Sequence, residues 1–148
     1  MKRASTDNRT FVPREWDAFF STLSPDERRS AAIRVCRRVL AARCPADALL
    51  REAVDSFARE NVTAEQLSAV EAALERLESE YDRLVGDDEG KLLHHDPVIR
   101  EIYEKARAGQ AVAFALEGAL ADMAYEAWLA FDPNDLDEIR RLVGMLDA

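Results

Sequence analysis

At 148 residues, with 48% hydrophobic and 33% charged side chains, the chain is long enough for one globular domain and too apolar to be intrinsically disordered. Its five glycines and five prolines are too few for a β-sandwich with its many turns. A disordered chain and a β-sandwich are therefore excluded.

The start of the chain and its cysteines bear on the cellular compartment. No apolar stretch follows Lys2 and Arg3, so we expect no secretory signal. Cys36 and Cys44 are eight residues apart, and on one helix they would lie about 12 Å apart along its axis, too far for a disulfide. Free cysteines favour a reducing compartment, which predicts a cytoplasmic location.

The net charge of −9 is unevenly distributed along the chain. Residues 1–43 carry ten basic and five acidic side chains, whereas residues 44–148 carry ten basic and twenty-four acidic ones. This asymmetry has two interpretations. The acids either form a solvated surface that favours solubility, or produce a negative field that steers a basic partner onto the protein.

The pattern of apolar residues divides the chain into a tail and a helical domain. Residues 1–10 are polar and lack periodicity, which predicts a flexible tail. Over residues 11–148, capping signals alternate with apolar residues at helical spacing. We therefore expect an all-α fold, a single-domain bundle of six to seven helices.

Three helices are predicted in the first half of the chain. A short one follows Pro13, and a third follows Pro45. Between them, Ser24 and Glu27 are typical of a capping box, which predicts a second helix that runs to about Ala42. The apolar stripes that we expect on these helices are Trp16, Phe19, Phe20 and Leu23, then Ile33, Cys36, Val39 and Leu40, then Leu50, Ala53, Val54 and Phe57.

A fourth helix should begin after Thr63, with Gln66 as its capping-box partner, and end near Gly86. Its apolar residues keep a heptad spacing for nearly three heptads, which suits packing inside the bundle or against a helix of another chain. Because three heptads are short for a free coiled coil, we favour packing inside the bundle. The heptad residues are Leu67, Val70, Leu74, Leu77, Tyr81 and Leu84.

A loop over residues 86–95 should precede a fifth helix that starts at Asp96-Pro97, and Gly109 should break or kink that helix. Residues 110–131 are apolar almost all round and predict a central helix. Asp132-Pro133 should cap the last helix. Inward-facing residues are expected to be Ile99, Ile102 and Tyr103 in the fifth helix, and Leu136, Ile139, Leu142 and Val143 in the last.

Three acids interrupt the apolar stretch 110–131: Glu117, Asp122 and Glu126. They argue against a membrane-spanning segment, because each is costly at the centre of a bilayer. Inside a packed bundle they need cationic partners. We expect arginines of the second helix to form structural ion pairs with them, in preference to a cofactor or substrate site. These are Arg34, Arg37 and Arg38, together with Arg28, Arg29 and Arg43.

No pattern in the sequence supports a metal, a cofactor or catalysis. His94 and His95 are adjacent, which is poor geometry for binding one ion. The acids around Asp132 lack the glycine that a calcium loop needs at its sixth position, and helix capping explains them. Cys36 falls on the apolar side of its helix, where we expect a buried and unreactive thiol. We expect a binding protein that is not an enzyme.

The second helix carries the only nucleic-acid signal, because its six arginines could contact phosphates. The acidic remainder of the chain would repel a polyanion. No aromatic residue is interleaved with the arginines on the solvent side, so bases have nothing to stack on. The balance is against nucleic acid as the partner.

Several segments resemble a recurrent bacterial pattern over roughly residues 28–75. They are Arg34-Val-Cys-Arg-Arg-Val-Leu40, Pro45, Arg51-Glu-Ala-Val-Asp-Ser-Phe57 and Thr63-Ala-Glu-Gln-Leu67. This pattern is similar to an all-α family of predicted immunity proteins from bacterial polymorphic toxin systems. The resemblance implies a cytoplasmic protein that binds and neutralises a cognate toxin. Many such toxins are basic nucleases, which an acidic binder would attract.

On this hypothesis the partner-binding acids are Glu71, Glu75, Glu78 and Asp82 of the fourth helix, or Asp87, Asp88 and Glu89 of the following loop. Two alternatives stay open. The protein is a helical adaptor or small subunit of a bacterial defence or regulatory complex, which contacts nucleic acid through its second helix or self-associates through the heptad residues. Otherwise, it binds a small molecule among its helices.

Overall fold

The computed structural model describes residues 10–86 and 96–146. Over these ranges the protein is an all-α, single-domain bundle without strands, as predicted. Of the predicted tail only Thr10 is described. The helices are α1 (Pro13–Ser21), α2 (Pro25–Arg43), α3 (Ala48–Ala58), α4 (Ala64–Val85), α5 (Pro97–Glu117), α6 (Leu120–Phe131) and α7 (Leu136–Val143).

The predicted helix starts are confirmed where a side chain caps the first turn. Ser24 accepts a hydrogen bond from the Glu27 backbone N–H (3.1 Å), and the Glu27 carboxylate accepts one from the Ser24 N–H (2.9 Å). Thr63 and Gln66 form the same reciprocal pair at the start of α4. The last helix differs, because Asp132 accepts from the Asn134 N–H in the preceding turn and α7 begins only at Leu136.

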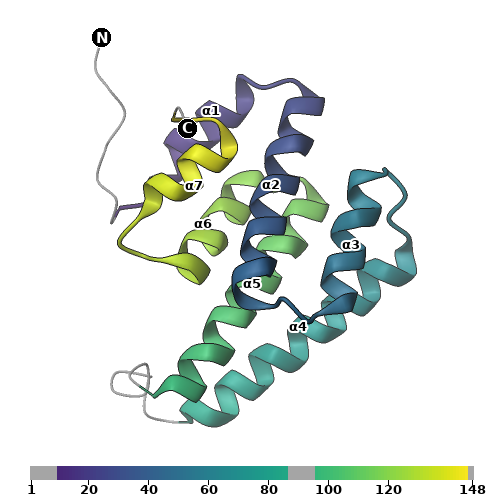
Figure 1. Cartoon of the computed structure of the whole chain (residues 1–148), viewed down its shortest axis with the longest axis vertical. Helices are drawn as coiled ribbons and strands as arrows, with labels where there is room; N and C mark the ends of the chain where they lie inside the picture. The colour runs from purple at the N-terminus through teal and green to yellow at the C-terminus, as the bar shows by residue number, and fades with distance from the viewer. Residues whose placement is uncertain (1–9, 87–95, 147–148) are drawn as a thin grey trace.

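Helices α5 and α6 form the centre of the bundle, with α2 packed across both (Figure 1). The prediction of one central helix over residues 110–131 is wrong. Helix α5 continues through Gly109 to Glu117 and ends at Gly118, whose left-handed backbone (φ 80°) reverses the chain into α6. Both helices carry fully buried alanines, and side chains this small allow packed helices to approach closely. Ala108, Ala111, Ala124, Ala127 and Ala130 are fully buried.

Gly109 neither ends nor interrupts α5, and the packing of α4 explains why a glycine stands there. A Cβ atom built at this position would overlap Leu74 Cδ2 of α4 and would contact the Leu50 side chain of α3. The missing side chain therefore lets three helices meet. Helix α5 stays uninterrupted because one internal glycine costs only about 1 kcal/mol of helix stability relative to alanine.

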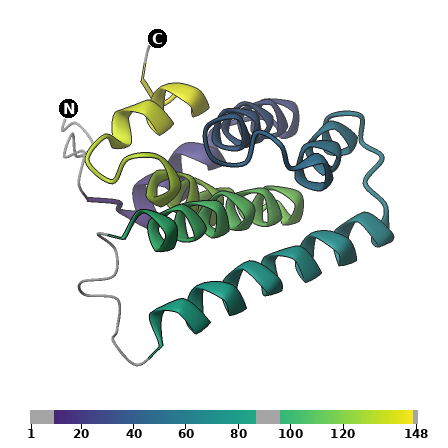
Figure 2. The ribbon, with the colours of Figure 1, turned by 60° about the horizontal axis from the view of Figure 1, so that its bottom comes forward.

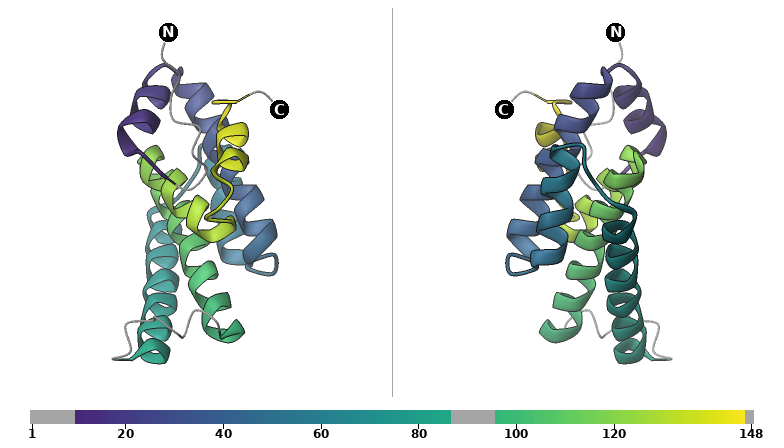
Figure 3. Two further views of the ribbon diagram at one scale, coloured as in Figure 1. Left: turned by 90° about the vertical axis from the view of Figure 1, so that its left-hand side faces the viewer. Right: turned by 90° about the vertical axis from the view of Figure 1, so that its right-hand side faces the viewer.

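Helix α4 is the outermost long helix and runs alongside α5 (Figure 2). The lower ends of both helices extend past the rest of the bundle (Figure 3). Val70 and Leu74 are buried, whereas Leu67 is exposed and the other heptad residues are half-buried. The heptad residues therefore pack mainly within the molecule, against α5 and more sparsely against α3. None of the helices described is both long and apolar enough to cross a membrane.

All six arginines of α2 contact other parts of the chain. Three of them cap the carboxyl ends of other helices, where backbone carbonyls lack helical partners. Arg28 Nε donates to Phe20 O of α1 (2.9 Å), Arg34 Nε to Leu142 O of α7 (2.8 Å), and Arg43 to Ala130 O and Phe131 O of α6 (2.7 and 2.8 Å). The other three form ion pairs: Arg29 with Glu60, Arg37 with Asp55 and Arg38 with Glu138.

Arg43→Gln should lower the free energy of unfolding by about 2 kcal/mol, because two carbonyls at the end of α6 lose a charged donor and Glu104 loses its ion pair. Arg37→Gln is the matched control on the same helix. Its partner Asp55 is 3.5 Å away and both side chains are more than half exposed, so a change within about 0.5 kcal/mol is expected. Urea unfolding measures both. Equal losses would contradict the capping role of Arg43.

Gly109→Ala should destabilise the protein by about 1 kcal/mol despite the better helix propensity of alanine, because the added methyl group overpacks Leu74. In a Leu74→Ala background the methyl group has room. The two substitutions should therefore be non-additive by at least about 0.5 kcal/mol, the double variant being more stable than the sum predicts. A double-mutant cycle in urea measures this coupling, and strict additivity would contradict the close approach of α4 and α5.

Candidate functional site

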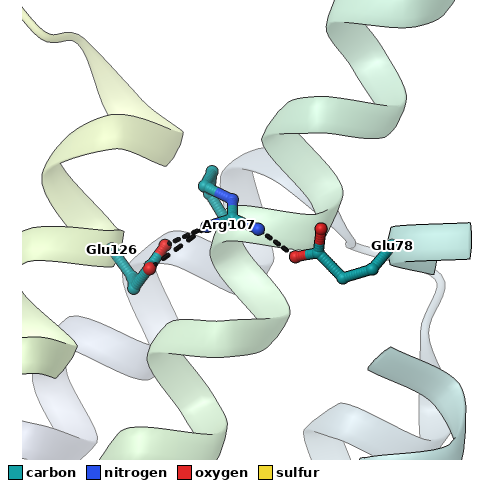
Figure 4. A network of polar contacts seen from close by, with 3 residues as sticks. All are labelled: Glu78, Arg107 and Glu126. Atoms are coloured by element: carbon teal, nitrogen blue, oxygen red, sulfur yellow. Dashed lines mark hydrogen bonds and ion pairs between the residues drawn. The ribbon is translucent and has the colours of Figure 1, made fainter. Parts of the chain in front are cut away.

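Arg107 of α5 lies between α4 and α6 and contacts a carboxylate on each (Figure 4). Its Nη1 donates to both carboxylate oxygens of Glu126 on α6, at 3.1 and 2.9 Å. Its Nη2 donates to a carboxylate oxygen of Glu78 on α4. We call these three side chains the Arg107 bridge. It joins three helices through one guanidinium group.

The Arg107 bridge is largely removed from water. The side chains of Glu126, Arg107 and Glu78 are 11%, 18% and 33% exposed, so burial increases from α4 inward. Charges in such a site interact more strongly than on the surface, because less water screens them. Two carboxylates share one arginine here, which leaves an excess negative charge between the helices.

The electrostatics of Glu126 reflect this excess. Burial raises the pKa of its carboxyl group, Arg107 opposes that shift, and the negative charges of Glu78 and Asp122 add to it. The net direction is upward. A buried carboxylate beside an arginine usually has a lowered pKa, so the upward shift shows that one shared cation does not fully offset burial and two acidic neighbours.

Two tyrosines lie near the Arg107 bridge. The Arg107 guanidinium carbon lies 5.6 Å from the centre of the Tyr103 ring, within range of a cation–π interaction. The Tyr81 ring of α4 lies 5.5 Å from the Tyr103 ring. Burial raises the pKa of both hydroxyl groups, and Arg107 opposes the shift in each. Tyr103 therefore adds a cation–π contact to the bridge, and Tyr81 packs against Tyr103.

The bridge revises the ion pairs that the sequence predicts. Glu126 is buried and paired, but its partner is Arg107 and not an arginine of α2. Glu117 and Asp122 are exposed and form no ion pair with any described residue, because the turn at Gly118 directs them to the surface. Arg34, Arg37 and Arg38 bind α7 and α3 instead.

Arg107 was not among the residues predicted for a site, and Gly109 was expected to break or kink the helix that carries it. A helix that stopped there would place Arg107 in an exposed last turn. One signal could have found it. Arg107 is flanked in the sequence by Ala106, Ala108 and Gly109, and such small residues are typical of a helix that packs closely against its neighbours. The structure buries all three.

The acids proposed to face a partner divide into three groups. Glu71, Glu75 and Asp82 are exposed on α4 and form no ion pair with any described residue. Glu78, the fourth residue of the predicted set, does not share that exposure because it turns inward to Arg107. The remaining residues, Asp87, Asp88 and Glu89, lie outside the described ranges.

The three exposed acids form one stripe along α4. At 100° per residue, Glu71, Glu75 and Asp82 lie within about 40° of one another around the helix axis. Glu78 lies at the inner edge of the same stripe. We call Glu71, Glu75 and Asp82 the acidic stripe. The Arg107 bridge thus fixes the rotation of α4 that presents the stripe to solvent.

The charges in the groove beside the α2–α3 turn are largely satisfied within the protein. One groove of about 650 Å³ lies between the α2–α3 turn and α5, and ion pairs Arg43–Glu104 and Lys105–Glu101 already satisfy most of its charges. Cys44 lines it, but burial raises the pKa of that thiol to about 11, so it is a poor nucleophile. Burial raises the pKa of Cys36 to about 12.

Metal binding finds no support in the described part of the chain, where no three His, Cys, Asp or Glu side chains gather as an ion would need. His94 and His95 lie outside the described ranges. Comparisons with family models, with curated proteins and with solved structures found no match to this chain.

Arg107→Met should lower the free energy of unfolding by about 3–5 kcal/mol, because it leaves two carboxylates facing each other without a cation in a largely buried site. Adding Glu126→Leu to this variant should restore part of the loss, since the deeper of the two stranded charges is then gone. Arg100→Met is the matched control on the exposed side of α5 and should change stability by no more than about 0.5 kcal/mol. Similar losses for the two single variants in thermal or urea unfolding would contradict the bridge.

Proposed function

We propose that this protein binds a basic protein partner through the acidic stripe of α4, and that it acts by binding and not by catalysis. One observation carries the proposal. Glu71, Glu75 and Asp82 are exposed on one side of a single helix and have no cationic partner among the described residues. Their charge is therefore directed outward.

Physical arguments favour such a surface for recognising a basic protein. Along the helix axis Glu71 and Glu75 lie about 6 Å apart and Glu75 and Asp82 about 10.5 Å apart. Each acid is therefore about one Debye length (about 8 Å at physiological ionic strength) from the next, and the potentials of neighbouring acids add. The summed potential raises the rate at which a basic partner finds the surface. Leu67, whose exposed side chain lies about 40° from Glu71 around the helix axis, adds apolar contact area that lengthens the lifetime of a complex.

The biological form that we propose is an immunity protein of the cytoplasm, which neutralises a basic toxin. It rests on the resemblance of residues 28–75 to predicted immunity proteins and on the charge of the stripe. An adaptor that contacts nucleic acid through α2 is less favoured, because each of the six α2 arginines already has a partner within the chain.

Co-purification with the product of the adjacent gene tests this proposal. The tagged wild-type protein should retain that product at low salt and release it progressively as the salt concentration rises. The variant Glu71→Lys, Glu75→Lys, Asp82→Lys should slow association by about 10–100-fold in a surface-binding assay, because attraction becomes repulsion.

The matched control reverses three exposed acids on other helices, Asp17→Lys, Glu52→Lys and Glu117→Lys, and thereby makes the same change in net charge. It should bind much as the wild type does. An adjacent gene whose product does not bind, or equal losses in the two triple variants, would contradict recognition through the acidic stripe.

A further inference from the structure

The Arg107 bridge attaches α4 at a position where the helix has few other neighbours. Helix α4 packs on α5 and sparsely on α3, and its lower half, beside the lower end of α5, extends past the rest of the bundle (Figures 2 and 3). The apolar residues of this half, Leu77, Tyr81 and Leu84, are only half-buried. The polar contact of Glu78 with Arg107 therefore carries more of the attachment here than it would in a fully packed core.

We propose that the Arg107 bridge is a proton-responsive attachment of α4: uptake of one proton by Glu126 tightens α4 against α5, and loss of that proton loosens it. The proposal stands on the composition of the site, in which two carboxylates on different helices share one guanidinium group. It goes beyond the proposed function and does not depend on a partner.

The charges that Glu78 faces explain the direction of the effect. When Glu126 is ionised, Arg107 and Glu126 together have no net charge, so the pull of the cation on Glu78 is opposed by repulsion from the second carboxylate. When Glu126 is protonated, the same two residues carry a net charge of +1. The attraction that holds Glu78, and with it α4, is then no longer opposed.

The groups that face Glu126 all come from the three helices of the site. They are Arg107 and Tyr103 on α5, Glu78 on α4 and Asp122 on α6 itself. Burial raises the pKa of Glu126, Arg107 opposes this, and both acids add to it. Because the folded protein holds this proton more tightly than the unfolded chain does, the contribution of Glu126 to stability grows as pH falls through its folded pKa. It levels off near the unfolded value of about 4.3.

Hydrogen exchange of the α4 amides over residues 74–84 tests the proposal, with rates corrected for the intrinsic effect of pH. In the wild type, protection should increase as pH falls through the folded pKa of Glu126 toward the unfolded value, by at most about tenfold per pH unit since one proton is involved. Glu126→Gln mimics the protonated side chain and should show high protection with no such pH dependence. Glu117→Gln, which removes an exposed acid at the end of α5, should behave as the wild type does.

A direct titration of Glu126 by carbon-13 NMR completes the test, because it does not depend on the stability of any variant. We expect a pKa above the ordinary glutamate value of about 4.3. A pKa at or below that value would overturn the proposal. So would α4 protection that is independent of pH or falls with pH in the wild type, or a pH dependence that persists in Glu126→Gln.

Discussion

A guanidinium group that leaves water must be neutralised from within the protein, and this requirement decides how α4, α5 and α6 meet. The cost of burying an isolated charge is several kcal/mol even after the protein relaxes. Arg107 meets it by hydrogen bonds to Glu126 on one side and Glu78 on the other. The two carboxylates in turn fix the rotation of α4 and α6 about their axes, and the close contact of Gly109 with Leu74 fixes the distance between α4 and α5.

The arginines of α2 solve a related problem at the ends of helices. Three of them donate to the last carbonyls of α1, α6 and α7, where the helical hydrogen-bond pattern has run out. Each of the six α2 arginines has a partner within the chain. The arginines of α2 bind other parts of the chain, whereas acids of α4 such as Glu71 and Glu75 remain directed to solvent.

Local signals in the sequence predicted most helix starts. Contacts between residues that are far apart in the chain could not be predicted from it. The residues of each capping box are three apart, so Ser24 with Glu27 and Thr63 with Gln66 can be read directly from the chain. The partners of Arg107 are 19 and 29 residues away, and only the folded chain brings them together. Charge balance predicted that Glu126 needs a cation, but several arginines satisfied that condition equally well.

The ends of α5 and α6 were also hard to predict, because glycine can either permit close packing within a helix or end the helix. Gly109 gives up its side chain so that Leu74 can approach, whereas Gly118 adopts a left-handed backbone that ends α5. Helical periodicity does not distinguish these uses. A break or kink was expected at Gly109 and none at Gly118. Glu117 was therefore predicted on one helix with Asp122 and Glu126, whereas α5 ends at Glu117 and α6 carries the other two acids.

Nitrogen-15 NMR of the Arg107 side chain tests the shared arginine most directly. If the guanidinium group is held by carboxylates on both sides at neutral pH, its Nη hydrogens should give separate signals, with slow rotation and slow exchange with water, and Glu78→Gln should speed that rotation. A single averaged signal that exchanges rapidly, like that of an exposed arginine such as Arg100, would contradict the account.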